Sequence, residues 1–225
     1  MAKEKINLQL YEYEQKFWNK NLLICGIDEV GRGCLAGPIV AAAAIVHPYQ
    51  YHPNLIDSKL LKPKSRTLVY NWLIQNSTYA IAINSSRIVD AHNIYKATQL
   101  TMKQALLHLC AKTANMPSLI LVDAMPLLLG NTPYDSIARE SLIKGELKSA
   151  SIAAASIIAK VTRDTIMQRI HKSIPNYNLQ QHKGYATENH RHLLKQYDRS
   201  IIHRKSFLKN FIQKKALYEQ TSFFT

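Results

Sequence analysis

The stretch CGIDEVGRGCLAGP, residues 25–38, ends an apolar run with glycines and opens a loop. The run at 22–30 has the length and composition of a buried strand, so Asp28 and Glu29 stand side by side where a strand stops. Adjacent residues of a regular strand point to opposite faces, and both acids can serve one site only if the strand ends or bends at Gly31. The chain carries a formal net charge of +14, so paired acids at this place require a chemical explanation.

A second apolar run follows the loop, and Gly37 and Pro38 between the two runs predict a hairpin turn. Periodic apolar residues further along predict an alternation of strands and helices. This order is typical of the α/β class, here a mixed sheet flanked by helices with basic helices at the C-terminal end. The predicted strands are 22–30, 39–46, 79–83 and 118–124, and the predicted helices are 63–75, 93–112, 149–171, 188–197 and 206–219.

The charge of the chain is uneven and favours a nucleic-acid partner. Residues 160–225 hold 13 Lys and Arg against 4 Asp and Glu, whereas residues 1–159 hold 16 against 11. A concentrated basic face attracts phosphates, although a basic surface that serves only solubility is an alternative. Four histidines of the same part are expected at the surface or on phosphates: His182, His190, His192 and His203.

Composition predicts a cytoplasmic globular protein. The 225 residues suffice for a sizeable core, and the longest apolar runs are too short to span a bilayer. The N-terminal residues lack the apolar segment of a signal peptide, and three cysteines without ligand spacing fit reduced thiols. We therefore expect a monomeric protein of the cytoplasm that does not enter a membrane.

Gly31, Gly33 and Ala36 match the G-x-G-x-x-A pattern of dinucleotide-binding loops, which is one alternative for the opening stretch. A pyrophosphate in that loop would lie beside Asp28 and Glu29, whose negative charges repel it. A single match of this kind is also unspecific. The two acids therefore make the dinucleotide interpretation the weaker one.

Divalent metal ions would give the acids a role that agrees with a basic chain. Mg²⁺ and Mn²⁺ prefer carboxylate oxygens, and phosphoryl chemistry often uses two such ions about 4 Å apart. One ion activates a water and the other stabilises the leaving oxygen, while both reverse the local charge toward a polyanionic substrate. Asp123 at the end of a strand and Glu146 after Gly145 are candidate partners of Asp28 and Glu29.

Six co-linear blocks resemble one known family, the type 2 ribonucleases H, and within it bacterial ribonuclease HII. Together the blocks extend from about residue 22 to 207 and leave only short ends uncovered. They are GIDEVGRGCLAGPIVAAAAIV (26–46), DSKLLKPKSR (57–66), ILVDA (120–124), KGELKSASIAAASIIAKVTRD (144–164), HKGYAT (182–187) and HRKSF (203–207).

The resemblance implies an RNase H-like mixed sheet flanked by helices, in a single domain of residues 1–225. A catalytic core of about 20–172 would precede a basic helical extension of about 173–225. The implied activity is an endonuclease that cleaves the RNA strand of RNA–DNA hybrids and incises 5′ of single ribonucleotides in duplex DNA, leaving 3′-hydroxyl and 5′-phosphate ends. Mg²⁺ or Mn²⁺ would be the cofactor, with two ions when substrate is bound.

The resemblance also assigns roles to individual residues. The catalytic and metal-holding acids would be Asp28, Glu29, Asp123 and Glu146. The substrate-binding residues would be Gly31, Arg32 and Gly33 at the 2′-hydroxyl of the ribonucleotide, Lys59 at phosphates, and Tyr185 against the adjoining sugar.

Particular residues separate this family from its neighbours. The related ribonuclease HIII has an extra N-terminal domain and lacks the arginine of the GRG block, whereas here Arg32 is present and only 27 residues precede Asp28. A hybrid-binding protein without activity would keep the basic tail but lose the acids. Ala124 stands where the family has glycine, and Glu146 stands where it has aspartate. The extra methylene of Glu146 moves its carboxylate by about 1 Å, enough to alter a positioned reaction.

Overall fold

The computed structural model describes residues 6–208 of the chain. These residues form two compact units that interleave along the sequence. The first unit takes in residues 6–30, 40–83 and 98–162, and the second takes in 31–39, 84–97 and 163–208. The expected single domain, with its division near residue 172, stays a prediction.

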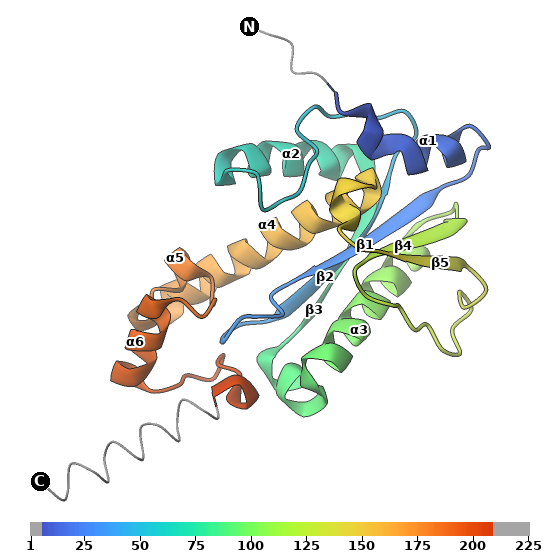
Figure 1. Cartoon of the computed structure of the whole chain (residues 1–225). Coiled ribbons are helices and arrows are strands. Elements are labelled where there is room, and N and C mark those ends of the chain that lie inside the picture. The colour runs from blue at the N-terminus through green and yellow to red at the C-terminus, as the bar shows by residue number, and fades with distance from the viewer. Residues whose placement is uncertain (1–5, 209–225) are drawn as a thin grey trace, which may run out of the picture. The chain divides into compact units, whose positions relative to one another are not determined.

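Helices and strands alternate along the described chain, and a mixed sheet with flanking helices confirms the predicted α/β class (Figure 1). The elements are η1 (Leu8–Tyr11), α1 (Glu12–Trp18), β1 (Ile24–Val30), β2 (Ile39–Val46), α2 (Pro63–Asn76), β3 (Ser77–Asn84), α3 (Ser86–Lys112), β4 (Leu119–Asp123), β5 (Ala138–Leu142), η2 (Gly145–Leu147), α4 (Ala150–Ser173), η3 (Pro175–Tyr177), α5 (Leu179–His182) and α6 (Glu188–Tyr197).

Two predicted elements differ from the structure in their extent. The connection between β1 and β2 spans residues 31–38, so it is longer than a turn made by Gly37 and Pro38 alone. The predicted helix 93–112 is the second part of α3, which begins seven residues earlier and kinks at Asn93, where φ is +63°. A left-handed residue interrupts the helical repeat, which explains why the apolar periodicity began only there.

The sequence patterns did not predict α1 or β5, because β5 is largely exposed and α1 is short. The predicted helix 188–197 coincides with α6. Of the predicted helix 206–219, residues 206–208 are helical and residues 209–219 lie outside the described residues. Within residues 6–208, no helix combines the length and the apolar character needed to cross a membrane.

The five-stranded sheet has the order β3-β2-β1-β4-β5 and belongs to the first unit apart from its end residues. β1 pairs antiparallel with β2, with Val30 opposite Val40, and parallel with β4, with Ile24 opposite Leu119. β4 and β5 are also parallel. The carboxyl ends of β1 and β4 therefore meet at one edge of the sheet, which brings the residues that follow them together.

Two apolar clusters cover the two faces of this sheet. On one face, Ile27 of β1 packs against Met102 and Leu106 of α3. On the other face, Ile24 of β1 packs against Ile152 of α4. Because side chains alternate along a strand, odd-numbered residues of β1 face α3 and even-numbered residues face α4.

β1 and α4 make their closest approach at Gly26. A Cβ atom built on this residue would lie 2.1 Å from the carbonyl carbon of Ser151 and 2.2 Å from the nitrogen of Ile152. Backbone cannot yield by that much, so only glycine allows the first turn of α4 to lie against the strand. This contact sets the height of α4 over the sheet.

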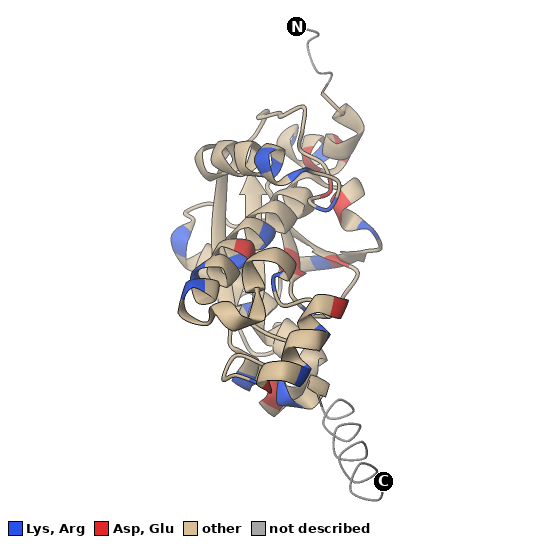
Figure 2. Ribbon diagram, turned by 90° about the vertical axis from the view of Figure 1, so that its left-hand side faces the viewer, with Lys and Arg blue, Asp and Glu red and all other residues tan. Residues whose placement is uncertain are grey.

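The second unit has an apolar core of its own. Leu35 and Met167 pack there with Leu179 and Leu194, which joins the end of α4 to α5 and α6. Lys and Arg outnumber Asp and Glu on α4 and on α6 (Figure 2). The basic character of the C-terminal helices agrees with the charge asymmetry of the sequence.

Ala124, which follows β4, has a φ of +49° and so occupies the left-handed region. We expect Ala124→Gly to raise the free energy of unfolding by about 0.5–1 kcal/mol, because it removes the Cβ strain at this position. Urea denaturation measures the change. The control Ala91→Gly, on the exposed surface of α3, should lower stability by about 1 kcal/mol. A loss of stability at both positions would contradict strain at Ala124.

Candidate active site

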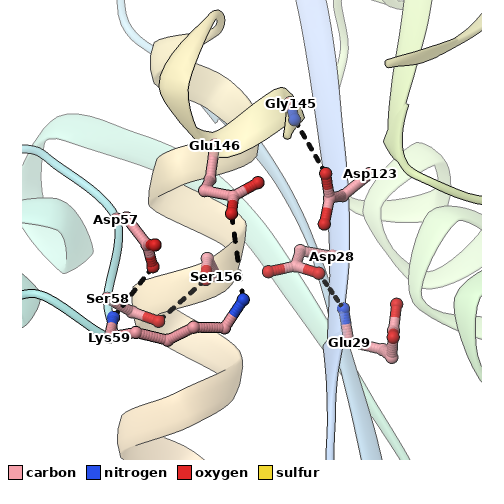
Figure 3. Close-up of polar contacts among 9 residues, drawn as sticks. All are labelled: Asp28, Glu29, Asp57, Ser58, Lys59, Asp123, Gly145, Glu146 and Ser156. Carbon is pink, nitrogen blue, oxygen red and sulfur yellow. Dashed lines mark hydrogen bonds and ion pairs between the residues drawn. The ribbon is translucent and has the colours of Figure 1, made fainter. Parts of the chain in front are cut away.

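Three carboxylates from three segments of the first unit converge on the α4 face of the sheet (Figure 3). Asp28 lies in β1 on the same face as Ile24, and Asp123 ends β4 on the same face as Leu121. Glu146 lies in η2, directly before α4. The side chains of Asp28 and Glu146 are buried, each residue being 7% exposed. The structure therefore brings together three of the four predicted metal-holding acids.

Glu29 leaves β1 on the opposite face. The strand stays regular and paired with β2 through Val30, so adjacent side chains alternate there as in any strand. Figure 3 shows the Glu29 carboxylate turned away from the other three acids. The bend before Gly31 that would bring Asp28 and Glu29 into one site is absent from β1.

Backbone and hydroxyl groups hold the converging acids. The Gly145 N–H donates to Asp123 Oδ1 over 2.7 Å. The Glu29 N–H donates to Asp28 Oδ1 over 2.7 Å, and the Ser156 and Ser58 hydroxyls lie 2.9 Å apart (Figure 3). A hydrogen bond from Ser156 also lowers the pKa of Asp28. Sequence reasoning passed over both serines, since the small residues of α4 indicated only close packing.

Crowding makes ionisation of these acids costly. Burial raises the pKa of Asp28 well above its ordinary value, and the Glu29 and Asp123 carboxylates raise it further. Burial also raises the pKa of Asp123 to about 6, with a contribution from the Glu146 carboxylate that the Gly145 N–H opposes. Like charges in a poorly solvated site repel one another, and a cation among them would relieve that repulsion.

Lys59 lies at the same group of acids. Its Nζ is 3.8 Å from Glu146 Oε1, and its side chain is 76% exposed against 9% for that of Glu146. Partial burial lowers the pKa of Lys59, but the carboxylates of Asp57 and then Glu146 outweigh this and raise it. The residue predicted to contact phosphate therefore partners a predicted metal-holding acid in the free protein.

The acids suit a divalent ion in kind and charge. Carboxylate oxygens are the ligands that Mg²⁺ and Mn²⁺ prefer, and Glu146 Oε2 is a buried acceptor without a hydrogen-bond partner. Within residues 6–208, no three His, Cys, Asp or Glu side chains are already arranged to hold an ion. Asp28, Asp123 and Glu146 would therefore have to turn toward the ion as it binds.

The predicted ribose-sensing residues Gly31, Arg32 and Gly33 belong to the second unit. Cys34, the next residue, forms a β-bridge with Tyr185. The structure therefore places Tyr185, which is 37% exposed, beside the loop with which it was predicted to act.

Two fully buried arginines hold this loop through its backbone. Arg163 donates to three carbonyl oxygens and Arg204 donates to two. Hydrogen bonds from a charged donor to buried carbonyls are stronger than neutral ones. The acceptors are the carbonyls of Pro38, Ala36 and Lys183 for Arg163, and those of Gly37 and Arg32 for Arg204.

A family model described as ribonuclease HII matches residues 25–210. The chain belongs to the ribonuclease HII family. The match covers all the acids of the site, both arginines and Tyr185, so the resemblance of the six sequence blocks is confirmed.

Curated ribonuclease HII proteins are similar over almost the whole chain. Ribonuclease HII of Macrococcus caseolyticus is 45% identical over 199 residues, which cover 88% of this chain and 71% of that protein. Ribonuclease HII of Caldicellulosiruptor bescii is 40% identical over 204 residues, which cover 90% of this chain and 95% of that protein.

Solved structures show the same fold at lower identity. Ribonuclease HII from Archaeoglobus fulgidus, in a complex with PCNA, is 24% identical with a TM-score of 0.67, covering 82% of this chain and 94% of that one. Ribonuclease H2 from Pyrococcus horikoshii is 22% identical with a TM-score of 0.65, covering 82% and 93%. These two structures support the RNase H-like arrangement of the sheet and its helices.

Membership of the ribonuclease HII family establishes the class of reaction. The chain is a metal-dependent ribonuclease H, a hydrolase of phosphodiester bonds that acts on RNA–DNA hybrids. The basic C-terminal part and the buried acids agree with a polyanionic substrate and a divalent cation. The dinucleotide-binding alternative has no support from the family match.

We expect Asp123→Asn to stabilise the metal-free protein at pH 8, because it removes a charge that burial and Glu146 disfavour. The melting temperature should rise by on the order of 2–4 °C, which is about 1 kcal/mol for a chain of this length. The pKa of Asp123 is about 6 in the folded protein and 3.8 ordinarily. The stability that Asp123→Asn adds is therefore complete above pH 6, where Asp123 is charged, and disappears below about pH 4.

Thermal unfolding with a chelator present measures this effect, and Glu12→Gln on the exposed surface of α1 is the control. Added Mg²⁺ or Mn²⁺ should raise the melting temperature of the unaltered protein more than that of Asp123→Asn. A lower melting temperature of Asp123→Asn at pH 8 would show that the carboxylates do not repel one another.

Proposed function

We propose that the chain, besides acting on RNA–DNA hybrids, incises duplex DNA on the 5′ side of a single embedded ribonucleotide. The products would carry 3′-hydroxyl and 5′-phosphate ends. One observation carries the proposal: β1 ends with the buried Asp28 and the partly exposed Glu29, and the glycine–arginine loop, residues 31–36, follows it directly in the chain. Groups for phosphodiester chemistry and for ribose recognition thus lie within a few residues of one another along the backbone.

Asp28, Asp123 and Glu146 would hold Mg²⁺ or Mn²⁺, with two ions when substrate is bound. When bound, the ions supply an activated water and stabilise the leaving oxygen of the phosphodiester. Glu29 would join this set only through a change at the end of β1, since its carboxylate lies on the α3 face. Asp28 keeps its orientation through the Glu29 N–H, and Asp123 through the Gly145 N–H.

Lys59 would change its partner during this cycle. In the free protein its ammonium lies 3.8 Å from Glu146 Oε1 and neutralises part of the acidic cluster. A divalent ion among the acids would replace that attraction, and the exposed, flexible lysine could then contact a substrate phosphate.

The loop would recognise the ribonucleotide by close approach of its backbone. Apart from its chain neighbours, no atom of residues 6–208 lies within 4 Å of a Cβ built on Gly33, so the position is open to a ligand. The 2′-hydroxyl both donates and accepts hydrogen bonds, and the exposed backbone at Arg32 and Gly33 can pair with it. Tyr185 would pack on the adjoining deoxyribose, because its ring is partly exposed beside Cys34. Monomeric state and cytoplasmic location stay predictions.

Three duplexes test the proposal: an RNA–DNA hybrid, a DNA duplex with one ribonucleotide, and the same duplex without it. We expect incision of the first two in Mg²⁺ or Mn²⁺, with the cut 5′ of the single ribonucleotide, and no cut in the third. Asp123→Asn should bind the ribonucleotide duplex yet cut it at least about 100-fold more slowly. A protein that cleaves the hybrid but leaves the single ribonucleotide intact would overturn the finer proposal.

Glu146→Asp tests the residue that departs from the family. Shortening the side chain moves the carboxylate by about 1 Å, so the ratio of the Mg²⁺ and Mn²⁺ rates should change by about tenfold or more. Single-turnover incision with each metal measures this ratio, and Glu188→Asp on the exposed start of α6 is the matched control. Equal rates of Glu146→Asp and the unaltered protein with both metals would show that the extra methylene is immaterial.

A further inference from the structure

Three histidines predicted at the surface or on phosphates are buried together in the second unit. His182, His190 and His203 are 7%, 0% and 3% exposed. The His182 and His190 rings are stacked with centroids 4.2 Å apart, and the His190 and His203 rings are 5.3 Å apart. His192 of α6, by contrast, is exposed as predicted.

The hydrogen bonds of His182 fix its protonation. Its Nδ1 accepts from the Gly184 N–H over 3.2 Å, so this nitrogen carries no proton. Its Nε2 lies 2.7 Å from the Tyr177 carbonyl oxygen, which can only accept. His182 is therefore uncharged with its proton on Nε2.

The other two histidines are fixed by the same reasoning. His203 Nδ1 accepts from the Ser200 N–H over 3.0 Å, which leaves the proton on Nε2. His190 Nδ1 lies 2.9 Å from the Tyr185 carbonyl oxygen and must donate to it. The remaining contact, 3.1 Å between the Nε2 atoms of His190 and His203, is then a hydrogen bond that His203 donates.

Every ring nitrogen of the three histidines thus has one role, and an added proton would break a bond. On His190 Nε2 it would oppose the His203 N–H, and on His182 Nδ1 it would oppose the Gly184 N–H. Burial, and then the neighbouring histidines, lower the pKa of His190 and of His203 to about 4. Burial also lowers the pKa of His182.

The histidines hold the segment that faces the glycine–arginine loop. The Gly184 carbonyl accepts from the backbone N–H groups of Leu35 and Ala36, and Cys34 pairs with Tyr185. On the other side, Ala36 pairs with His203 in a second β-bridge. The loop is therefore bonded between residues 184–185 and residue 203, and the histidine series links these two supports.

We propose that His182, His190 and His203 are positioning residues for substrate recognition: an uncharged hydrogen-bonded series that fixes Tyr185 and the 31–36 loop in the conformation that distinguishes a ribonucleotide. This inference rests on the proposed function of that loop. None of the three histidines contacts substrate in this role; each acts through the backbone of residues 184, 185 or 200.

Cations and histidines around the series disfavour an added proton, whereas the Asp198 carboxylate favours one on His203. His171 and Lys183 face His182, Asp198 faces His203, and cations exceed acids in the hollow that His203 lines. These groups are His171, Lys183, Asp198, Arg204, Tyr177, whose ring packs against His203, and, around that hollow, Arg87, Asp90, Arg199 and Lys205.

Nitrogen NMR of labelled histidine at pH 7 tests the series without substrate. We expect three uncharged rings, with the proton on Nδ1 in His190 and on Nε2 in His182 and His203. A charged ring or a different tautomer at any of the three positions would overturn the proposed series.

Binding tests the positioning role. The readout is the discrimination ratio, the Kd of an all-DNA duplex divided by the Kd of the same duplex with one ribonucleotide, measured at pH 7.5 with a chelator. His190→Ala should lower this ratio by roughly three- to tenfold, as expected for losing one or two hydrogen bonds. His190→Asn keeps a donor near the Tyr185 carbonyl and should restore most of the ratio, while His192→Ala should leave it unchanged.

The outcomes separate this inference from the proposed function. If the unaltered protein has a ratio near one, the proposed recognition of single ribonucleotides fails. If it discriminates and a folded His190→Ala does so equally well, the positioning role fails. Should His190→Ala not fold, His190→Asn with His203→Gln breaks the link between the rings and must lower the ratio.

The pH dependence of stability tests whether His190 and His203 are uncharged in the folded protein. The unfolded histidines have an ordinary pKa of 6.5 and the folded His190 and His203 of about 4, so unfolding takes up protons between these values. The contribution of these two histidines to stability should therefore be full above about pH 6.5 and be lost as pH falls toward 4. His190→Asn should take up about one proton fewer on unfolding in this window, and an unchanged slope would contradict the assignment.

Discussion

The contact of α4 with β1 at Gly26 is the constraint on which the candidate site depends. Without a side chain at this position, the first turn of α4 lies directly on the strand, and η2 before it carries Glu146 to the end of β4. The same placement lets Ser156 reach Asp28. Glu14 of α1 supports the arrangement, since its buried carboxylate accepts hydrogen bonds at the first turn of α4, where a helix favours negative charge.

Charge acts at two distances in this chain. The excess of Lys and Arg attracts a polyanion from about 10 Å, the range over which salt leaves surface charge effective. The acids act only at contact, where burial makes their mutual repulsion strong and a divalent ion the group that best removes it. Lys59 moderates the repulsion in the free protein, but a single exposed ammonium 3.8 Å from one oxygen cannot neutralise three carboxylates. In the free protein, part of the repulsion among the carboxylates therefore remains until a divalent cation binds.

Sequence reasoning predicted whatever depends on periodicity and missed what depends on tertiary contacts. The apolar runs predicted β1, β4 and α4. Their strand ends and neighbouring glycines indicated that Asp28, Asp123 and Glu146 converge. The prediction that a bend joins Asp28 and Glu29 needed backbone detail that a strand pattern lacks. β5 was missed because four of its five residues are exposed. His182, His190 and His203 were expected at the surface or on phosphates, because only the fold provides the carbonyl and amide partners that let histidine be buried.

Gly31 and Gly33 of the glycine–arginine loop are glycines for different physical reasons. Gly31 has a φ of +102°, and a Cβ there would lie 2.4 Å from Arg163 Nε, so the folded loop itself requires glycine. Gly33 has no such requirement, because nothing in the described part of the chain, its two neighbours aside, approaches the place of its Cβ within 4 Å. The fold would tolerate a side chain at Gly33. Because the residue has none, its backbone is exposed to a substrate. Gly31 therefore lets the loop pack against Arg163, and Gly33 leaves the backbone accessible, which close contact with a sugar requires.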